Sequence, residues 1–271
     1  MKRVASALGI SRPHLSTSSR SAPKPRDCYD KPSDADTLAR IAPIVEGRPT
    51  YGYRRVTALL NREPAAMRVN HKRIYRIMKR AGLLLPKYTG LPERPHNGKV
   101  ITLKSDLRWC SDGFEIRCWN GERVYVAFSL DCCDREAIAW VAGSAHLTGQ
   151  EIRDLMAMSV EARFRQQHTA HPVQWLSDNG PPYTAHETRA FGAACGLLIR
   201  NTPAYCPESN GIAEAFVKTF KRDYVYLGAV DDAATVIAQL PAWFADYNQH
   251  HPHKGLKMLS PRQFRQLHAN H

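Results

Sequence analysis

The sequence predicts an α/β fold, in which a mixed five-stranded sheet with flanking helices follows a small all-α domain. The first observation is a change from helical periodicity to alternating and continuous apolar runs near residue 100. The second is charge: residues 1–100 hold 21 Lys and Arg against 7 Asp and Glu, whereas residues 101–271 hold 17 against 18. A basic part joined to a near-neutral part favours contact with a polyanion, most simply nucleic acid, over a merely soluble basic surface.

The first hundred residues predict a DNA-binding region. Residues 1–33 are rich in Ser, Pro, Lys and Arg, so we expect a flexible basic segment there. Residues 34–88 show three short helical stretches, the last starting at a capping Asn70 and carrying many bases. This is typical of a helix-turn-helix DNA binder, although a helical bundle with a solvated basic face fits too. Residues 89–103 are Pro/Gly-rich and predict a linker, which leaves residues 104–271 as the second domain.

The second domain begins with three antiparallel strands, because Asn120-Gly121 is a strong hairpin signal and a short turn follows the second strand. A helix starting at a Thr148 cap comes next, and strands and helices then alternate. The predicted strands cover residues 108–119, 122–133, 137–145, 172–178 and 197–204, and the helices 148–167, 185–196, 208–224 and 233–251.

Composition excludes several classes of protein. The seven cysteines are odd in number and show no C-x-x-C spacing, so we expect reduced thiols and no zinc site. His250, His251 and His253 are interpreted as a polar loop. No run of about 18 apolar residues predicts a membrane span, and no apolar N-terminal stretch predicts a signal peptide, so we expect a cytoplasmic protein.

Two aspartates lie at informative places on the predicted strands. Asp112 is the only charge on the apolar face of its strand, where a carboxylate needs a partner. Asp178 ends a buried strand, and ligands bind at the carboxyl ends of strands in α/β sheets. Each has an ordinary alternative, since exposed carboxylates are common and Asp178-Asn179-Gly180 is a good turn by itself.

The third acid, Glu214, lies on the predicted helix 208–224, which Ser209 or Asn210 would cap. A salt-bridged surface helix or a catalytic acid facing a polyanion would both explain its row of charges. If the three acids converge, their oxygens suit Mg²⁺ or Mn²⁺ rather than zinc. The apolar stripe of this helix is Ile212, Phe216 and Phe220, and the bases on the side of Glu214 are Lys218, Lys221 and Arg222.

The motifs together resemble a known family. Asp112, Asp178 after 65 residues and Glu214 after 35 more are similar to the D-D-35-E signature of transposases and retroviral integrases. "YGYRRV", "LSDNGPPY", "PESNGIAEAFVKTFKRDY" and "YNQHHPHKGLKMLSPRQF" resemble the OrfB transposases of the insertion sequence 3 family, near the insertion sequence 2 subgroup, over about residues 34–266.

The resemblance implies an RNase H-like integrase core and two Mg²⁺ or Mn²⁺ ions held by Asp112, Asp178 and Glu214. It implies DNA cleavage and strand transfer by in-line phosphoryl transfer, without ATP, and a phosphate contact by Lys221. We further expect a homo-oligomer on the DNA of the bacterial nucleoid, and fusion with or binding to OrfA. The full set of expected DNA contacts is Lys218, Lys221, Arg222, Asn179, Arg54, Arg55, Lys72, Arg73 and Arg76.

Two other functions stay open from the sequence. A non-catalytic DNA-binding regulator made from a truncated element would need only the basic first hundred residues. A nuclease of the same fold would hydrolyse DNA without transferring it to a 3′-OH.

Overall fold

The computed structural model describes residues 2–7, 9, 31–63, 67–86, 102–201 and 211–268. The chain divides into two compact units, residues 1–42 and 43–271. Residues 10–30 of the predicted flexible segment 1–33, most of the predicted linker 89–103 and the predicted caps Ser209 and Asn210 lie outside the described residues. In the part that is described, no helix is long and apolar enough to cross a membrane.

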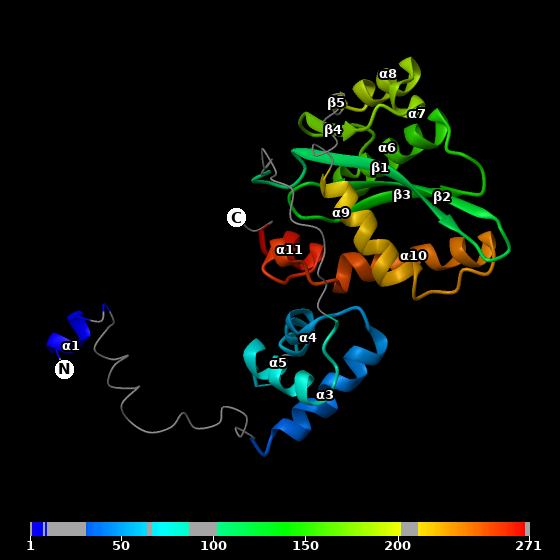
Figure 1. Cartoon of the computed structure of the whole chain (residues 1–271). Coiled ribbons are helices and arrows are strands. Elements are labelled where there is room, and N and C mark those ends of the chain that lie inside the picture. The colour runs from blue at the N-terminus through cyan, green and yellow to red at the C-terminus, as the bar shows by residue number, and fades with distance from the viewer. Residues whose placement is uncertain are drawn as a thin grey trace. The chain divides into compact units, whose positions relative to one another are not determined.

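Three helices occupy the region where the sequence predicts a helical domain (Figure 1). Helix α5 begins where the sequence predicts, because the Asn70 side chain accepts the backbone N–H of Lys72 at 2.9 Å. Its apolar face is buried, and α4 packs against it. The short helix α1 (Lys2–Ala7) lies in the first unit, and α3 runs across the boundary between the units. The three helices are α3 (Asp34–Gly47), α4 (Tyr53–Leu60) and α5 (His71–Arg80).

The second unit contains the predicted mixed five-stranded sheet, in the order β3-β2-β1-β4-β5 (Figure 1). The first three strands are antiparallel neighbours, and β4 and β5 run parallel to β1. Gly121 in the β1–β2 turn has φ +91°, which explains the glycine of the predicted Asn-Gly hairpin. The strands are β1 (Arg108–Arg117), β2 (Arg123–Asp131), β3 (Ala137–Gly143), β4 (Val173–Ser177) and β5 (Leu197–Asn201).

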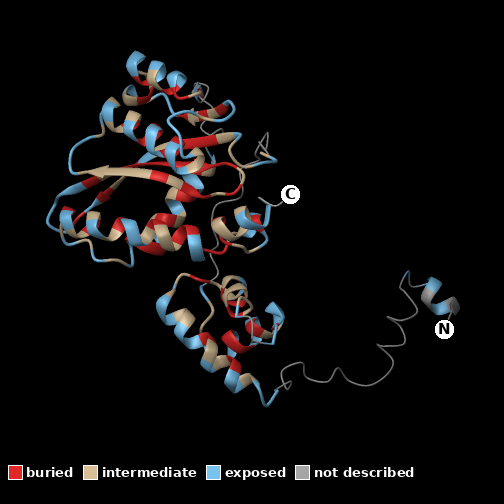
Figure 2. Ribbon diagram, turned by 180° about the vertical axis from the view of Figure 1, so that it is seen from behind, coloured by how far each residue is buried: buried red, intermediate tan, exposed pale blue. Residues whose placement is uncertain are grey.

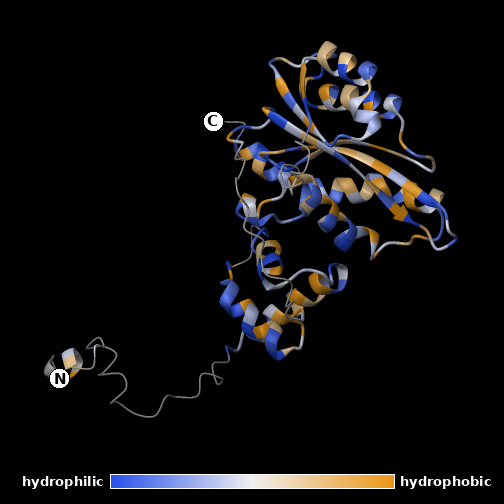
Figure 3. Cartoon of the chain, turned by 45° about the horizontal axis from the view of Figure 1, so that its top comes forward, coloured by the Kyte–Doolittle hydropathy of each residue, from blue (hydrophilic) through white to orange (hydrophobic). Residues whose placement is uncertain are grey.

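Helices cover both faces of this sheet, and each face has its own buried cluster (Figure 2). Aromatic side chains of α9 and α10 pack on β1 and β2, while α6 packs on β2 and β3 on the other face. Hydrophobic residues alternate with hydrophilic ones along the strands (Figure 3). The helices and helical turns are α6 (Gly149–Phe164), α7 (Pro181–Thr184), α8 (His186–Ala194), α9 (Gly211–Phe220), the π-helix η2 (Lys221–Val225), α10 (Ala233–His250), the 3₁₀-helix η3 (Lys254–Leu256) and α11 (Pro261–His268).

The predicted order of elements in the second domain is confirmed, and five short elements were not predicted: α1, α7, η2, η3 and α11. Each has eight or fewer residues, too few for periodicity to distinguish a helix from a loop. The predicted apolar stripe of α9 is confirmed, because Phe216 and Phe220 are buried and Ile212 packs against the same cluster.

A buried ion-pair cluster joins the β2–β3 turn to α6 and α11. The Arg163 side chain, only 2% exposed, lies 3.0 Å from the fully buried Asp134 and 3.3 Å from Glu136. Glu136 also pairs with Arg262 and Arg265 of α11. Because burying a carboxylate without a partner is costly, these arginines stabilise the fold by pairing with the buried acids.

Replacing Arg163 with methionine should lower the free energy of unfolding by about 3–5 kcal/mol, because it leaves Asp134 buried without its partner. Urea denaturation followed by circular dichroism measures this. The matched control is Arg165→Met, at an exposed position two residues further on, with an expected change within about 0.5 kcal/mol. Equal losses in the two variants would contradict the role of the pair.

Candidate active site

Strand register brings two of the predicted acids together. Cys110 of β1 pairs with Leu176 of β4 in parallel, so two residues further along each strand Asp112 and Asp178 occupy adjacent positions. Adjacent strands lie about 4.8 Å apart, and residues separated by two share one face of the sheet. Asp112 and Asp178 are therefore delivered to the same face at the end of β4.

The packing of α9 against the sheet places Glu214 on this face. The rings of Phe216 and Phe128 have centroids 4.4 Å apart, and Phe128 pairs with Asp112 across the β1–β2 ladder. One turn further along α9, Phe220 packs on Phe114 at 5.7 Å. The apolar stripe of α9 thus docks the helix beside Asp112, as the sequence predicts.

The electrostatics show that the three carboxylates affect one another. Burial is the largest cause that raises the pKa of Asp112, and with the smaller contributions of the negative charges of Asp178 and Glu214 the pKa reaches about 6. The Gly113 N–H donates to Asp112 Oδ1 at 2.8 Å and opposes the shift. The partner that a buried carboxylate needs is thus a backbone donor, and its charged neighbours are acids rather than a cation.

Local hydrogen bonds hold Asp178 in its turn. The Gly180 N–H donates to Asp178 Oδ1 at 3.0 Å, and the Asn201 side chain of β5 donates to the Asp178 carbonyl at 2.7 Å. A Cβ at position 180 would lie only 3.1 Å from Asp178 Oδ1, which favours glycine there. Asp178 and Glu214 are exposed, so the site opens to solvent.

The donor set fits hard divalent cations. Carboxylate oxygens are the ligands of Mg²⁺ and Mn²⁺, and a cation between these acids would remove the repulsion that raises the pKa of Asp112. Among the residues that the structure describes, no three His, Cys, Asp or Glu side chains already form a group able to hold a metal ion. The acids are therefore near one another without being closed into a ligand cage.

The bases after Glu214 do not all share its side of the helix. Lys218 is exposed on α9, and the Lys221 ammonium lies 5.7 Å from the centre of the Phe114 ring. The α-helix ends at Phe220, and a π-helix follows. The prediction that Arg222 shares the side of Glu214 assumed a continuous α-helix, so it is wrong. Arg222 turns to Asp223, whose carboxylate accepts from its Nε at 2.6 Å and from its Nη2 at 2.7 Å.

Asp223 is an anchor that the sequence analysis missed. Its side chain, 2% exposed, accepts from Thr50 Oγ1 at 2.7 Å and lies 3.4 Å from Arg55 Nη1. Arg55 and Arg222, predicted as DNA contacts, both pair with this carboxylate. The sequence offers one signal, since Asp223 is an acid that directly follows Lys221 and Arg222.

A second pair ties the same segments together. Arg48 makes a bidentate contact with Asp246 of α10, at 2.9 and 2.6 Å. The Tyr51 hydroxyl hydrogen-bonds the buried His251 Nδ1 at 2.9 Å. Burial lowers the pKa of His251, so this ring is neutral. The prediction of a polar loop at His250, His251 and His253 is wrong in part, because His250 ends α10 and His251 is buried.

The remaining predicted DNA contacts lie at two places. Asn179 is in the turn beside Asp178. On the helical segment, Arg54, Lys72 and Arg76 line an open groove of about 550 Å³ with Tyr53 and Tyr75. Bases interleaved with aromatic rings are typical of nucleic-acid surfaces. Arg73 on the same helix is half-buried.

Comparisons with known proteins agree with this architecture. Residues 33–89 match the family described as an HTH-like domain, and residues 103–207 and 196–261 match the integrase core domain. The chain is 46% identical over 239 residues to transposase InsD for insertion element IS2A/D/F/H/I/K of Escherichia coli, covering 85% of this chain and 78% of the relative. The same identity holds for transposase InsD for insertion element IS2-9, of which 77% is covered.

The chain belongs to the OrfB-type transposases of the insertion sequence 3 family. It is an enzyme of the transposase and integrase class, and the function predicted from the sequence is confirmed. A chain of the simian T-cell lymphotropic virus intasome, in complex with the PP2A regulatory subunit B56 gamma, shares the fold with a TM-score of 0.52 and 14% identity, over 83% of this chain and 74% of that one. The predicted RNase H-like fold is also confirmed.

The raised pKa of Asp112 gives this transposase a testable pH dependence. The pKa is about 6 in the folded chain, above the ordinary 3.8, so the folded state binds a proton more tightly. The contribution of Asp112 to the free energy of unfolding therefore increases as pH falls from about 6 toward 4. Above pH 6 the ionised carboxylate lowers the free energy of unfolding. Without divalent metal, Asp112→Asn should raise the free energy of unfolding by roughly 1–2 kcal/mol at pH 7, after allowance for solvent screening, and by little at pH 4.

Urea denaturation in a chelator at both pH values measures the effect. Asp154→Asn, at an exposed position on α6, is the control and should change stability equally little at pH 4 and pH 7. An Asp112→Asn variant with no advantage at pH 7, or with the same advantage at both, would contradict the repulsion.

Proposed function

We propose that Asp112, Asp178 and Glu214 are the catalytic acids of this transposase and that together they hold two divalent cations, Mg²⁺ or Mn²⁺. The observation that supports this most is the pKa of Asp112, which burial and the charges of Asp178 and Glu214 raise to about 6. Three acids from β1, the end of β4 and α9 thus act at one place. Perturbed carboxylates of this kind cluster at functional sites.

The reaction we propose begins with attack of water on a phosphodiester at an element end, which frees a 3′-OH. That 3′-OH then attacks a second phosphodiester in line, and the strand cut there leaves with its own hydroxyl. Bound cations would supply charge neutralisation for the attacking and leaving oxygens. The chain's own contribution is positioning: Gly113 fixes one oxygen of Asp112, and Gly180 fixes one of Asp178. One phosphodiester is exchanged for another, so no ATP is required.

Two sets of cations would hold the DNA. Lys218 and Lys221 follow Glu214 along α9 and the π-helix, where they would contact phosphates near the reacting bond. Arg54, Lys72 and Arg76 on the helical segment would contact DNA further away. Arg55, Arg222, Arg73 and Asn179 stay predictions, and the first two would have to leave Asp223 to bind phosphate.

The names of the Escherichia coli relatives place them on insertion elements, and we infer the same kind of substrate here. We also propose that the chain acts as a homo-oligomer on DNA of the bacterial nucleoid, with OrfA as a fusion partner or bound subunit. OrfA would add end recognition to the phosphate contacts made by this chain.

Joining of DNA strands tests the three acids. Asp112→Asn, Asp178→Asn and Glu214→Gln should each lower joining by more than about 100-fold, since each removes a charged ligand. The substrate is a labelled duplex ending in the inverted repeat that flanks the gene, and the assay follows its transfer into a plasmid in Mn²⁺. Glu161→Gln, an exposed acid on α6, is the control and should keep full activity.

Electrophoretic shifts on the same duplex should show unchanged binding in all four variants. Undiminished joining by any one of the three acid variants would overturn its assignment. DNA binding by the wild-type chain with no cleavage or joining would favour the regulator, and cleavage without joining would favour a nuclease.

A further inference from the structure

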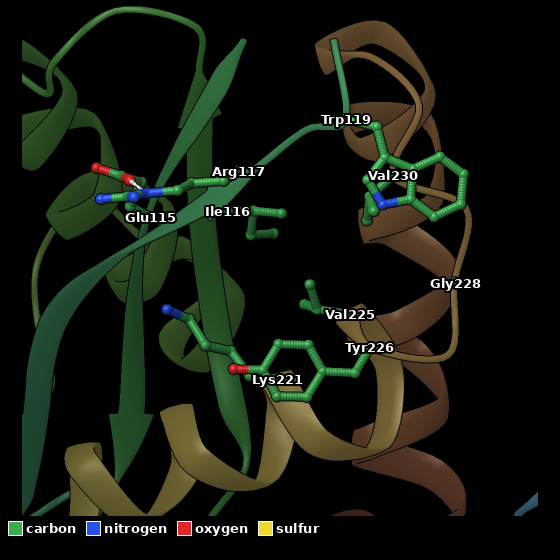
Figure 4. A pocket seen from close by; sticks show the side chains of 9 residues that line it. All are labelled: Glu115, Ile116, Arg117, Trp119, Lys221, Val225, Tyr226, Gly228 and Val230. Carbon is green, nitrogen blue, oxygen red and sulfur yellow. Dashed lines mark hydrogen bonds and ion pairs between the residues drawn. The ribbon is translucent and has the colours of Figure 1, made fainter. Parts of the chain in front are cut away.

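A groove of about 620 Å³ lies further along the elements that carry Asp112 and Glu214, and of its lining residues only Lys221 has a role in the function described so far (Figure 4). It lies between the end of β1, the hairpin turn after it, and the π-helix with its following loop. The residues that matter for its chemistry are Ile116, Arg117, Trp119, Lys221, Val225 and Tyr226.

Two large aromatic side chains at this groove are exposed to solvent. Trp119 is 77% exposed and Tyr226 is 73% exposed, although such rings are normally used to bury apolar area. Neither position is loose: the Trp119 N–H donates to the Val230 carbonyl at 2.8 Å, and the Tyr226 N–H donates to the Lys221 carbonyl at 2.9 Å. The backbone thus presents both rings from fixed positions.

The floor between the rings is apolar and its rim is cationic. Ile116 and Val225 are buried and lie between Trp119 and Lys221 in Figure 4. Arg117 is exposed on the rim and pairs with Glu115 at 2.7 Å. Arg123, which is outside the groove lining, also contacts Glu115, so the two cations of the lining, Arg117 and Lys221, outnumber its one acid.

The elements that carry the acids lead directly into this groove. From Asp112 to Ile116 is four residues of β1, roughly 13 Å at 3.3 Å per residue. From Glu214 to Lys221 is seven residues, roughly 10 Å at an α-helical rise. Stacked nucleotides in one DNA strand rise about 3.4 Å each, so the groove lies about three to four nucleotides from the acids.

We propose that this groove binds an unstacked nucleobase of the DNA strand held at the acids, with the base against Trp119 and Tyr226 and its phosphate at Lys221. The inference rests on the proposed function and adds a base-binding subsite to it. Exposed aromatic rings beside cations are the features by which proteins bind single-stranded DNA, because every base has a stacking face.

The test separates base contacts from phosphate contacts. The probes are a fluorescein-labelled ten-nucleotide oligothymidylate and an abasic oligomer of equal length, and anisotropy in a chelator gives their affinities for the full chain. The wild type should bind the thymidylate about 5- to 100-fold more tightly than the abasic probe. Trp119→Ala and Tyr226→Ala should each reduce this ratio toward one with little change in abasic binding, and Trp119→Phe should restore much of it.

Two controls fix the interpretation. Met158→Ala removes a 45% exposed apolar side chain on α6 and should leave the ratio unchanged. Lys221→Ala should weaken both probes alike. A wild-type ratio of one, or a ratio that survives both Trp119→Ala and Tyr226→Ala, overturns the proposal. Loss of self-association in Trp119→Ala at an unchanged ratio, measured by sedimentation, also overturns it and assigns the groove to a second copy.

Failure of this subsite is distinguishable from failure of the proposed function, because the binding assay contains no metal and measures no joining. Joining that depends on Asp112 together with a ratio of one overturns the groove alone. A ratio that depends on Trp119 in a chain unable to join DNA supports the groove and removes the catalytic assignment.

Discussion

The placement of Asp112, half-buried and beside two other carboxylates, is the constraint on which the arrangement of the integrase core depends. Asp112 is partly buried beside Asp178 and Glu214, and its pKa near 6 records the free energy that this placement costs. The parallel register of β1 and β4 delivers the two aspartates, while Phe216 and Phe220 hold Glu214 near them by burying the apolar stripe of α9. Hydrophobic packing thus offsets an unfavourable electrostatic arrangement, which a divalent cation would convert into a favourable one.

The fold was predictable because its signals are local. The Asn-Gly turn, the caps at Asn70 and Thr148 and the apolar stripe of α9 each agree with the element that forms. The candidate acids were identifiable because Asp112 interrupts an apolar strand face, where an unpaired charge is unfavourable without a function. The proximity of the three acids was not predictable from periodicity, because periodicity does not give the strand register. The family resemblance supplied that expectation instead.

Contacts between distant parts of the sequence were not predictable. Asp223 appeared as one more charge in a basic helix, whereas in the structure it anchors Thr50, Arg55 and Arg222. Asp223 lies on a π-helix, in which side chains point in other directions than in an α-helix. A prediction that assumes an α-helix therefore misplaces these side chains. The exposed position of Trp119 likewise follows from a turn held by the Val230 carbonyl rather than from composition.

The central claim, that the three acids form one divalent-metal site, is tested most directly by Mn²⁺ binding. Electron paramagnetic resonance of free Mn²⁺ gives the number of bound ions and their affinity, without DNA and without turnover. The account predicts that Asp112→Asn, Asp178→Asn and Glu214→Gln each weaken binding by about tenfold or more, and that Glu161→Gln binds as the wild type does. Mn²⁺ binding unchanged in Glu214→Gln, or lost equally in Glu161→Gln, would contradict it.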